Sequence, residues 1–438
     1  IIIPANSATG GGYEVSNSLR FNSGSSDYLN RTLGTPTLAT KNTLSIWFKK
    51  AKLGADQSMI LGNGNQGGIN LHNDDGVVFY NAGGSLRTNR KLRDTSAWYN
   101  LVVVTDTTLN TATDRLKMYI NGVQETSFSS SGNPSQNAAS NLGSATAHNI
   151  GVNNSPANYF NGYMSEFVFI DGTALDPTSF GEFDEDSSIW KPKNVSGLTF
   201  GTNGFYLKFG NSGALGTDSS GEGNTFAVNN LTAIDQSTDT CTNNFATMNP
   251  LDNYWQGSAF SDGNTTVTTT NASQSYNTSS IMVSSGKWYV ECKPVSGGSE
   301  PEIGIFSKLT GANAGNNSQL SYNANGYAYR ASDPGSVWYN GSAVSTSFSQ
   351  YANGDIVGIA LDLDNNKLYF SKNGTFGNSG NPTSGATGTG AISIVAPAST
   401  TLGAYGFAAN ENFNDQNKVF SWNFGSPPYA ISSGNTDG

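Results

Sequence analysis

Histidine and cysteine are scarce in this chain of 438 residues, which holds two of each: His72, His148, Cys241 and Cys292. So few imidazoles disfavour a histidine-based metal site or a Ser-His catalytic pair, because both need histidine at the reacting centre. Cys241 falls in a polar stretch and Cys292 in the strand-like WYVEC. We expect two free thiols, with a disulfide between them as the alternative.

Charge is also in short supply. Charged residues make up 12% of the chain, and acids outnumber bases by 32 to 22, for a formal net charge of −10. A negative chain is repelled by the phosphates of nucleic acid, so we expect no nucleic-acid partner. The shortage of Lys, Glu and Arg also removes most of the good helix formers.

Long apolar runs are missing as well. No run approaches the roughly 20 residues needed to span a bilayer as a helix, so we expect no membrane insertion. The opening IIIPAN has three isoleucines and a proline without a basic region, which does not fit a secretory signal. Processing could have removed such a signal from the mature chain.

Aromatic residues, by contrast, reach 11%, and glycine accounts for 52 positions. The aromatics can build hydrophobic cores, which separates this chain from disordered proteins. Thr, Tyr, Phe and Val favour strands, while Gly and Asn favour the turns between them. The composition predicts an all-β sandwich or barrel, and the length allows two or three domains of about 100–200 residues each.

Alternating apolar and polar residues, bounded by Gly, Asn or Asp, mark short strands in both halves. In the first half they occupy residues 18–23, 43–50, 58–62, 68–72, 77–81, 99–106, 115–122 and 163–172. In the second half they occupy residues 287–295, 302–307, 326–331, 335–341, 355–364, 366–374 and 418–425. Asn121-Gly122 predicts a two-residue hairpin turn. Residues 129–147 are polar and predict a long loop.

Residues 181–250 separate the two sets of strands and resemble a connector in composition. Within them GFYLKFGN (204–211) alternates Phe205, Leu207 and Phe209, which predicts a strand closing the first domain beside SLRFNS. Residues 211–250 are rich in Ser, Asn, Thr and Gly without periodicity, so we expect a polar linker there. A fragment ending at residue 212 should then fold alone.

The first half resembles a laminin-G-like domain, a sandwich of the concanavalin A type, in NSLRFN, TLSIWFKK, AWYNLVVVTD, LKMYINGVQ and NYFNGYMSEFVFIDG. The second half resembles a SPRY domain, of the same fold type, in KWYVECKP, EIGIFS, GDIVGIALDLDNNKLYFSKNGTF and VFSWNFGSPPY. With linker phrases such as FGEFDEDSSIWKPK and TNNFATMNPLDN, the tandem resembles large virion proteins of marine bacteriophages. In that family the chain often continues past the SPRY module, so residue 438 need not be its natural end.

The resemblance and the strand pattern together predict two tandem concanavalin A-like antiparallel β-sandwiches of jelly-roll type. We expect, in order, an N-terminal arm (1–12), a laminin-G-like sandwich (13–180), a connector (181–242) in which 204–211 closes the first sandwich, a SPRY-like sandwich (243–430) and a C-terminal tail (431–438).

Three aspartates, Asp355, Asp362 and Asp364, lie in GDIVGIALDLDNNKLYFSKNG, and paired acids of this kind occur in metal and catalytic sites. Asp362 and Asp364 alternate with Leu361 and Leu363, however, as polar residues do on a half-buried strand. Asp364 also opens Asp-Asn-Asn, a sequence typical of turns. The phrase is a structural hairpin in SPRY domains, and we interpret the three acids as structural.

The strongest enzyme candidate is GEFDEDSSIW (181–190), because Glu182, Asp184 and Asp186 alternate as on the acidic strand of laminarinase-type glucanases. Retaining glycosidases need two carboxyls about 5–5.5 Å apart. The glucanase pattern ends in Glu where this chain has Asp186, and the segment follows the last laminin-G-like strand. We therefore favour solvated connector acids and expect no catalytic residues.

NDDG (73–76) offers Asn73, Asp74 and Asp75 as oxygen donors between two strands. Laminin-G-like domains can bind calcium at one rim through Asp side chains and carbonyls, and Ca²⁺ takes roughly six to eight oxygens. An ordinary turn explains the same residues, since Asp and Asn before Gly are common in turns. The segment is therefore either a calcium site or an ordinary turn. We expect no other cofactor.

Trp338 and Tyr339 stand directly before Asn340-Gly341. Flat rings beside amides suit the apolar face and the hydroxyls of a glycan. Alternating strand aromatics are also common in cores, so we expect one ring of the pair to be buried. Trp338, Tyr339 and Asn340 are the candidate ligand-binding residues.

These expectations describe a non-enzymatic virion structural or adhesion protein, as a tail or capsid fibre or a capsid decoration, that recognises host cell-surface glycans. The resemblance implies host glycans and other virion proteins as partners, and a place on the virion surface after synthesis in the host cytoplasm. We expect a homo-oligomer, with a trimer favoured by analogy with phage fibres. Two alternatives stay open: a glycan-cleaving hydrolase (depolymerase) on the same fold, and a purely architectural capsid or tail component.

Overall fold

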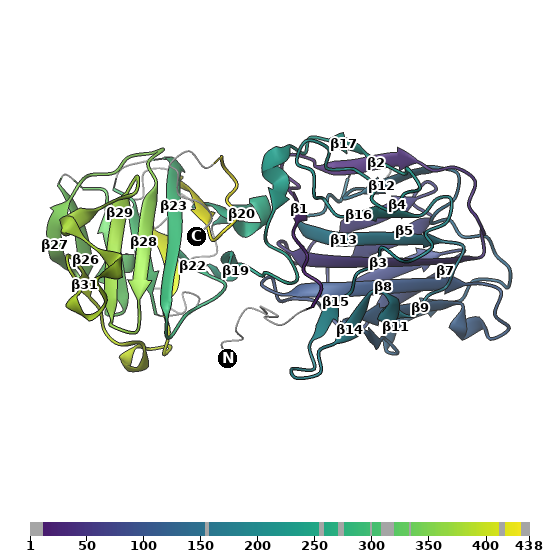
Figure 1. Cartoon of the computed structure of the whole chain (residues 1–438), viewed down its shortest axis with the longest axis horizontal. Coiled ribbons are helices and arrows are strands. Elements are labelled where there is room, and N and C mark those ends of the chain that lie inside the picture. The colour runs from purple at the N-terminus through teal and green to yellow at the C-terminus, as the bar shows by residue number, and fades with distance from the viewer. Residues whose placement is uncertain are drawn as a thin grey trace. The chain divides into compact units, whose positions relative to one another are not determined.

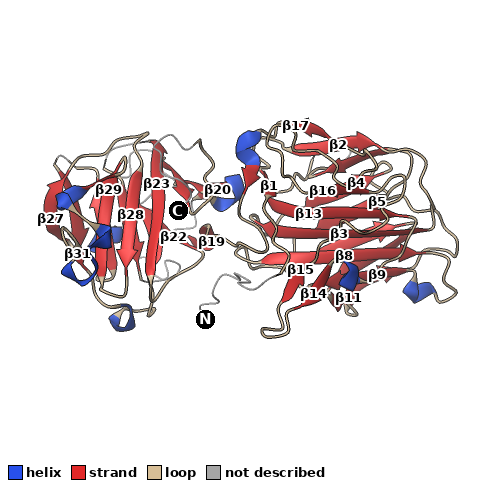
Figure 2. Ribbon diagram, viewed as in Figure 1, coloured by secondary structure: helices blue, strands red, loops and turns tan. Residues whose placement is uncertain are grey.

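The chain folds into two compact units that divide between Asn244 and Phe245, beside the boundary drawn from the sequence at 242/243. The computed structural model describes residues 12–153, 157–253, 258–269, 276–297, 300–307, 319–332, 334–410 and 417–430. Antiparallel strands dominate both units, with short 3-10 helices between them (Figure 2). The predicted all-β fold of tandem antiparallel sandwiches is confirmed. Residues 1–11 of the predicted arm and the predicted tail (431–438) lie outside the described residues.

The first unit, coloured from purple to teal in Figure 1, consists of two large sheets. The β3 sheet comprises β1 (Ser18–Phe21), β3 (Lys41–Lys50), β8 (Trp98–Asp106), β9 (Leu116–Ile120), β10 (Val123–Gln124), β13 (Gly162–Asp171), β16 (Phe205–Leu207) and β18 (Gln236–Ser237). The β5 sheet comprises β2 (Tyr28–Thr32), β4 (Gln57–Gly62), β5 (Gly67–Leu71), β6 (Val77–Asn81), β7 (Gly84–Thr88), β11 (Phe128–Gly132), β12 (Ala147–Ile150) and β17 (Ala227–Asn229). The strand orders are β10-β9-β8-β3-β13-β1-β18, with β16 beside β13, and β11-β7-β6-β5-β4-β12-β2-β17.

Smaller elements complete the first unit as far as it is described. They are the hairpin of β14 (Gly181–Phe183) and β15 (Trp190–Pro192), and the 3-10 helices η1 (Ala112–Asp114), η2 (Pro177–Ser179) and η3 (Ala233–Asp235). In neither unit does a helix of the described residues have the length and apolar character needed to cross a membrane.

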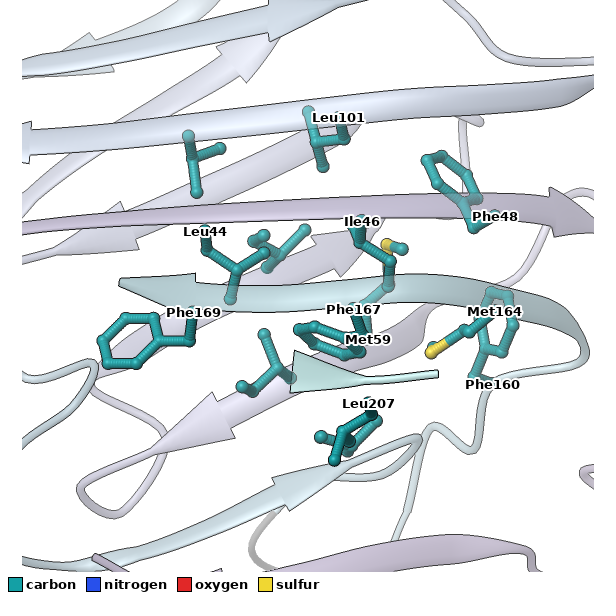
Figure 3. Close-up of a cluster of buried hydrophobic side chains, with 14 of the residues drawn as sticks. Leu44, Ile46, Phe48, Met59, Leu101, Phe160, Met164, Phe167, Phe169 and Leu207 are labelled. Atoms are coloured by element: carbon teal, nitrogen blue, oxygen red, sulfur yellow. The ribbon is translucent and has the colours of Figure 1, made fainter. Parts of the chain in front are cut away.

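Alternate side chains of the two sheets meet in one hydrophobic core. Leu44, Ile46 and Phe48 of β3 lie in it with Phe167 and Phe169 of β13, as Figure 3 shows. Successive residues of a strand point to opposite faces, so a period of two on β3 brings three large side chains to one face. Burial of each such side chain contributes about 1.5–3 kcal/mol relative to leaving it exposed.

The outward face of the β3 sheet is covered by the end of the first unit. Val168 and Ile170 of β13 lie in an apolar cluster with Phe180, Phe200 and Tyr206, which come from residues that follow the strand in sequence. A further cluster, formed by Val15, Trp47, Trp98, Tyr163, Trp190 and Cys241, lies on the same sheet. The central strands β3 and β13 are therefore buried on both faces.

The prediction of a polar connector at 181–242 is consequently wrong, because these residues belong to the first sandwich. β17 pairs with β2, and β18 pairs with β1. β16 lies within the predicted closing strand at 204–211, but it pairs with β13 and not with SLRFNS. The polar stretch 129–147, predicted as a loop, contributes to β11, which pairs with β7.

Buried polar pairs explain how such a polar segment can cover a sheet. Lys49, 1% exposed, forms an ion pair of 2.8 Å with Asp239, which also accepts a hydrogen bond from the indole N–H of Trp98. The indole N–H of Trp190 donates to Asn100 Oδ1 at 3.0 Å. Because a buried charge or amide without a partner is costly, these contacts tie the segment to the sheet without apolar periodicity.

The predicted Asn121-Gly122 turn joins β9 to β10. Both residues have positive φ, 50° and 75°, as a two-residue hairpin of this type requires. A Cβ at position 122 would lie 2.3 Å from the ring of Trp190. Glycine therefore serves both the turn and the close approach of the covering tryptophan.

The second unit, coloured green to yellow in Figure 1, is also a sandwich of two sheets. The β24 sheet comprises β19 (Met248–Asn253), β22 (Tyr276–Ser279), β24 (Glu302–Phe306), β25 (Gly326–Arg330), β26 (Gly335–Tyr339), β27 (Ser342–Phe348) and β32 (Gly406–Asn410). The β28 sheet comprises β20 (Ala259–Ser261), β21 (Thr266–Thr268), β23 (Lys287–Ser296), β28 (Val357–Asp362), β29 (Lys367–Lys372), β30 (Thr375–Phe376), β31 (Ile392–Ser393) and β33 (Val419–Asn423). The strand orders are β19-β22-β32-β24-β25-β26-β27 and β20-β21-β33-β23-β28-β29-β30, with β31 beside β29.

Short helices connect these strands, and one core lies between the sheets. The helices are η5 (Asp262–Asn264), η6 (Leu320–Tyr322), η7 (Gly377–Ser379), η8 (Pro382–Thr387) and η9 (Pro397–Ser399). Ile303, Ile359 and Trp422 are among the core residues, and Cys292 is buried with them. Cys241 is buried in the other unit, and both cysteines are free thiols, as expected. Burial raises the pKa of both thiols.

Candidate functional site

The predicted ligand residues of β26 are divided between two faces of the β24 sheet. Trp338 and Tyr339 are neighbours on a strand, so their rings point in opposite directions. The ring of Tyr339 stacks on Tyr327 with 4.4 Å between centroids and packs against the core of the second unit. One ring of the pair thus faces the core, which leaves Trp338 and Asn340 for the outward surface.

Trp338 lies beside Tyr322 of η6. The two rings are 6.2 Å apart at their centroids with 15° between their planes, and Tyr322 is 45% exposed. The Gly341 N–H donates to the carbonyl of Ser321 at 3.0 Å, so the turn after β26 is tied to η6. Asn340 is exposed at the left-handed first position of that turn, with φ 47°. We call Tyr322, Trp338 and Asn340 the Trp338 cluster.

Arg330 of β25 supports both rings of the cluster. Its guanidinium carbon lies 4.5 Å from the centre of the Trp338 ring and 5.9 Å from that of Tyr322. Its Nε lies 3.0 Å from Glu302 Oε1, and its terminal nitrogen donates to Gln319 Oε1 at 3.3 Å. A cation over an aromatic face contributes about 0.5–2 kcal/mol, so Arg330 fixes the orientation of the rings.

Glu302 anchors this arrangement from a fully buried position. Its carboxylate accepts hydrogen bonds from the Ser321 hydroxyl at 2.6 Å and from the Ser321 N–H at 3.2 Å, and a further one from the Asn410 amide at 3.3 Å. Burial raises the pKa of Glu302, while Ser321 and Arg330 oppose that rise. With these partners, the carboxylate acts as a structural counter-ion for Arg330.

Sequence reasoning found Trp338 and Asn340 but missed Tyr322 and Arg330. The alternation in GYAYRA (326–331) contains a signal for Arg330, because Tyr327 and Tyr329 face the core and Arg330 takes the other face. Tyr322 lies in a short helix outside any periodic segment, and the tertiary fold alone brings it to Trp338.

The side chains around NDDG do not fit a calcium ion. Asp75 Oδ1 lies 2.9 Å from the buried ammonium of Lys50, and Asp74 Oδ2 lies 2.5 Å from Lys91 Nζ. The hydrogen bond from Lys91 holds the pKa of Asp74 well below its usual range. The Asn73 N–H donates to the Asp56 carboxylate, in the loop between β3 and β4, at 2.9 Å. Cations already occupy the places that calcium needs, and the contacts support the turn interpretation.

No other metal centre emerges from the described part of the chain. There, no group of three or more His, Cys, Asp or Glu side chains is placed to hold a metal ion.

The acidic segment GEFDEDSSIW forms the β14–β15 hairpin at the lower side of the first unit in Figure 1. Glu182 Oε1 lies 3.6 Å from Lys191 Nζ, which also lies 3.2 Å from Asp184 Oδ2. Asp184 Oδ1 accepts hydrogen bonds from the N–H groups of Asp186 and Ser187 in the hairpin turn. Hydrogen bonds from Ser187, with a smaller effect of Lys191, lower the pKa of Asp184 to about 2. Glu182 and Asp184 therefore have ionic and turn-forming partners, and Asp186 is exposed.

The aspartates of GDIVGIALDLDNNKLYFSKNG hold their hairpin together. Asp362 is buried at the end of β28 and accepts hydrogen bonds from the N–H of Asn365 at 3.1 Å and from its side-chain amide at 2.9 Å. Asp364 accepts a hydrogen bond from the Gly286 N–H at 2.8 Å. Asp355 accepts one from the side-chain amide of Asn373, in the turn between β29 and β30, at 2.7 Å. These contacts support the structural interpretation of all three acids.

Comparison with known proteins found one matching family model and solved structures that resemble parts of the chain. Residues 23–178 match a laminin-G family model, described as the concanavalin A-like lectin/glucanases superfamily. No curated protein matches the sequence. Among solved structures, the SPRY domain of human HERC1 is 14% identical with a TM-score of 0.31, and the match covers 40% of this chain and 96% of that one.

Two further structures resemble parts of the chain. A protein of Bacteroides ovatus to which carbohydrate binding has been attributed is 14% identical with a TM-score of 0.32, covering 50% of this chain and 60% of that one. The heptameric SAP-like pentraxin of Limulus polyphemus is 12% identical with a TM-score of 0.28, covering 37% of this chain and 80% of that one. At these values the likenesses assign no function to this chain.

Proposed function

We propose that this chain is a non-catalytic carbohydrate-binding protein and that the Trp338 cluster is its glycan site. The observation that carries the proposal is the exposed ring of Tyr322 stacked beside Trp338, with the Asn340 amide at the rim. A pyranose ring has a face of C–H groups that can lie on an aromatic ring, and its hydroxyls can bond to amide groups.

Arg330 and Glu302 favour binding of a ligand to the Trp338 cluster without rearrangement of its side chains. Arg330 lies over both rings and is paired with the buried Glu302, so the rings are held before a ligand arrives. Binding to a preorganised site avoids the entropy cost of ordering side chains.

The proposal excludes hydrolysis. A retaining glycosidase needs two free carboxyls across the scissile bond. Glu182 and Asp184 are engaged by Lys191 and by the hairpin turn, which speaks against the depolymerase alternative. Loss of hydrolysis of a host polysaccharide in Glu182→Gln would establish that alternative instead.

In biological terms, we assign the chain to a phage virion, as a fibre, adhesion or decoration protein that contacts host surface glycans. The tandem of laminin-G-like and SPRY-like sequence phrases supports this role. A family match that includes lectins by its description, over residues 23–178, supports a glycan as the ligand. Labelling of purified phage particles with an antibody against the chain tests the location, and unlabelled particles would contradict it.

The glycan site is tested by screening the full chain on a glycan array and measuring the affinity for the best sugar by calorimetry. Trp338→Ala and Tyr322→Ala should each weaken binding about tenfold or more, as loss of an aromatic anchor does. Trp288→Ala is the matched control, because Trp288 is a 46% exposed tryptophan of the same unit on the β28 sheet.

Equal losses in Trp288→Ala and Trp338→Ala would refute the assignment of the site. A blank array for the correctly folded chain would refute glycan binding and favour the purely architectural alternative. A homo-oligomer, preferably a trimer, would multiply weak sites through avidity. Light scattering that gives a monomer would contradict this part of the proposal.

A further inference from the structure

Lys49 lies between two aromatic side chains on the outward face of the β3 sheet. The register pairs it with Trp98 of β8 on one side and with Tyr163 of β13 on the other. Its side-chain nitrogen is 5.8 Å from the centre of the Tyr163 ring, and only 1% of the residue is exposed. The covering segment and the aromatic rings thus separate a primary amine, the nucleophile of a lysine, from bulk water.

A tight turn at the end of the first unit brings a carboxylate and a carboxamide to this amine. The backbones of Thr240 and Asn243 exchange two hydrogen bonds of 3.1 Å. The flanking residues, Asp239 and Asn244, consequently lie opposite each other across the turn. Asp239 Oδ2 and Asn244 Oδ1 are each 2.8 Å from Lys49 Nζ. One nitrogen therefore contacts both an acid that can take its protons and an amide that it can attack.

Neighbouring groups hold the carboxylate and the carboxamide in place. The indole N–H of Trp98 donates to Asp239 Oδ1 at 2.9 Å, so the other oxygen of the carboxylate faces Lys49. The side-chain amide of Asn244 donates to the Ser96 carbonyl at 2.8 Å, so its oxygen and not its nitrogen faces the amine. Well-oriented groups within one molecule reach effective concentrations of about 10⁵–10⁸ M, which makes otherwise slow reactions feasible.

We propose that Lys49 and Asn244 become joined by an isopeptide bond, an amide between their side chains, with Asp239 as the proton carrier. Lys49 Nζ bonds to Cγ of Asn244, and the bond between Cγ and Nδ2 breaks. Two protons leave the lysine nitrogen, and Asp239 passes both to Nδ2, which departs as ammonium and leaves Asp239 a carboxylate again. An ammonium and a carboxamide thus give a secondary amide and an ammonium, and no other reactant is consumed.

The adjacent lysine shows which feature of Lys49 carries the proposal. Lys50 is also buried, and its Nζ lies 2.9 Å from Asp75 Oδ1 and 3.2 Å from the Leu92 carbonyl. Lys50 therefore has a carboxylate beside it, but a backbone carbonyl in place of a side-chain carboxamide. A backbone amide has no ammonia to release, so Lys50 stays unmodified and serves as an internal reference.

The bond gives the cover of the β3 sheet a covalent attachment. Lys49 lies near the end of β3, and Asn244 is the last residue of the first unit. The chain between them, which holds most strands of that unit, becomes a closed loop. Closure of a long loop restricts the unfolded chain, as a disulfide does.

The test is the mass of the intact, denatured full chain by mass spectrometry. We expect a mass about 17 Da below that of the sequence, which corresponds to the loss of one ammonia. Asn244→Ala and Asp239→Ala should each show the full mass of their own sequence. Asn243→Ala is the matched control, because it removes the exposed neighbouring amide and should retain the loss.

Peptide mapping then locates the bond. Trypsin should release one branched peptide in which Lys49 carries the segment that contains Asn244, while cleavage after Lys50 proceeds normally. The full sequence mass for a wild type that is folded by circular dichroism refutes the proposal. A loss of ammonia that Asn244→Ala retains also refutes it, because the loss then arises at another asparagine, as in a succinimide. An Asp239→Ala chain that folds and still forms the branched peptide refutes the role of Asp239.

Discussion

The two sheets of the first sandwich share one core but differ on their outward faces. On the β3 sheet, outward residues such as Val168 and Lys49 are buried under residues 181–242. On the β5 sheet, outward residues such as Val78 and Tyr80 stay partly exposed. A segment with the composition of a linker thus decides which outward face of the sandwich is covered.

The largest expected effect comes from removing the end of that cover. A fragment ending at residue 212 lacks β17, β18 and Asp239, so the buried ammonium of Lys49 loses its ion pair. We expect this fragment to be unfolded, because an uncompensated buried charge and exposed sheet edges together approach the whole stability of a domain, about 5–15 kcal/mol. A fragment ending at residue 244 should unfold cooperatively, as followed by circular dichroism.

The same experiment can break the comparison. Equal melting temperatures for the two fragments would mean that residues 213–244 contribute no stability, and the original connector prediction would be restored. The cover of the β3 sheet would then depend on Phe180, Phe200 and Tyr206, which both fragments contain.

A smaller effect is expected from one ion pair in the cover. Asp239→Ala leaves Lys49 buried without its carboxylate and removes the acceptor of the Trp98 indole. We expect a loss of about 3–5 kcal/mol in the free energy of unfolding, measured in urea. Asp114→Ala is the control, because its 3.8 Å pair with Lys117 is exposed and should contribute less than about 1 kcal/mol.

Similar losses for Asp239→Ala and Asp114→Ala would show that the cover is not held by its buried charges. The apolar contacts of Trp190 and Phe180 would then have to account for its attachment.

Much of the fold was predictable because long strands carry their own signal. β3, β28 and β29 show apolar alternation, and β8 carries a run of four apolar residues. Each lies within a predicted strand or differs from one by a few terminal residues. β17 has three residues and β18 has two. Their backbones pair with β2 and β1, and they contribute no apolar stripe to the core. Sequence periodicity reports burial, so a strand attached by polar contacts leaves no trace in it.

The candidate sites were predictable to a smaller extent. Trp338 and Asn340 were visible because an aromatic pair before Asn-Gly is a local pattern. Tyr322 and Arg330 reach Trp338 only in the folded sheet. NDDG resembled a calcium site because the sequence shows the carboxylates of Asp74 and Asp75 side by side. It does not show that Lys91 and Lys50 lie against them in the folded chain.

A direct measurement of the two outward faces uses the same substitution on each. Val168→Ala removes methyl groups packed under Phe180 and Tyr206 and should destabilise the protein by about 1–3 kcal/mol. Val78→Ala removes them from a partly exposed position on the β5 sheet and should cost less than about 1 kcal/mol. Equal losses by urea unfolding would mean that the two faces are equally covered.

The smallest expected effect concerns pH and has opposite signs on the two sheets. Glu166 of β13 is buried in the cover, where its carboxyl accepts hydrogen bonds from the hydroxyls of Tyr206 and Tyr13. Burial raises the pKa of Glu166 above its usual value, an effect that the two tyrosines reduce. The folded state then holds the proton more tightly than the unfolded state. Glu166 therefore contributes stability that is fully present below its ordinary pKa and is lost as the pH rises through the raised one.

Asp74, on the β5–β6 turn, provides the opposite case. Hydrogen bonds from Lys91 and Arg87 lower its pKa, so its contribution is present above the ordinary pKa of aspartate and is lost as the pH falls. Relative to Glu166→Gln, the wild type should lose unfolding free energy as the pH rises above the ordinary pKa of glutamate, about 4.3. Relative to Asp74→Asn, it should lose unfolding free energy as the pH is lowered below about 4. Urea unfolding across this pH range measures both differences, and a Glu166→Gln curve parallel to that of the wild type would show that the carboxyl is not buried by the cover.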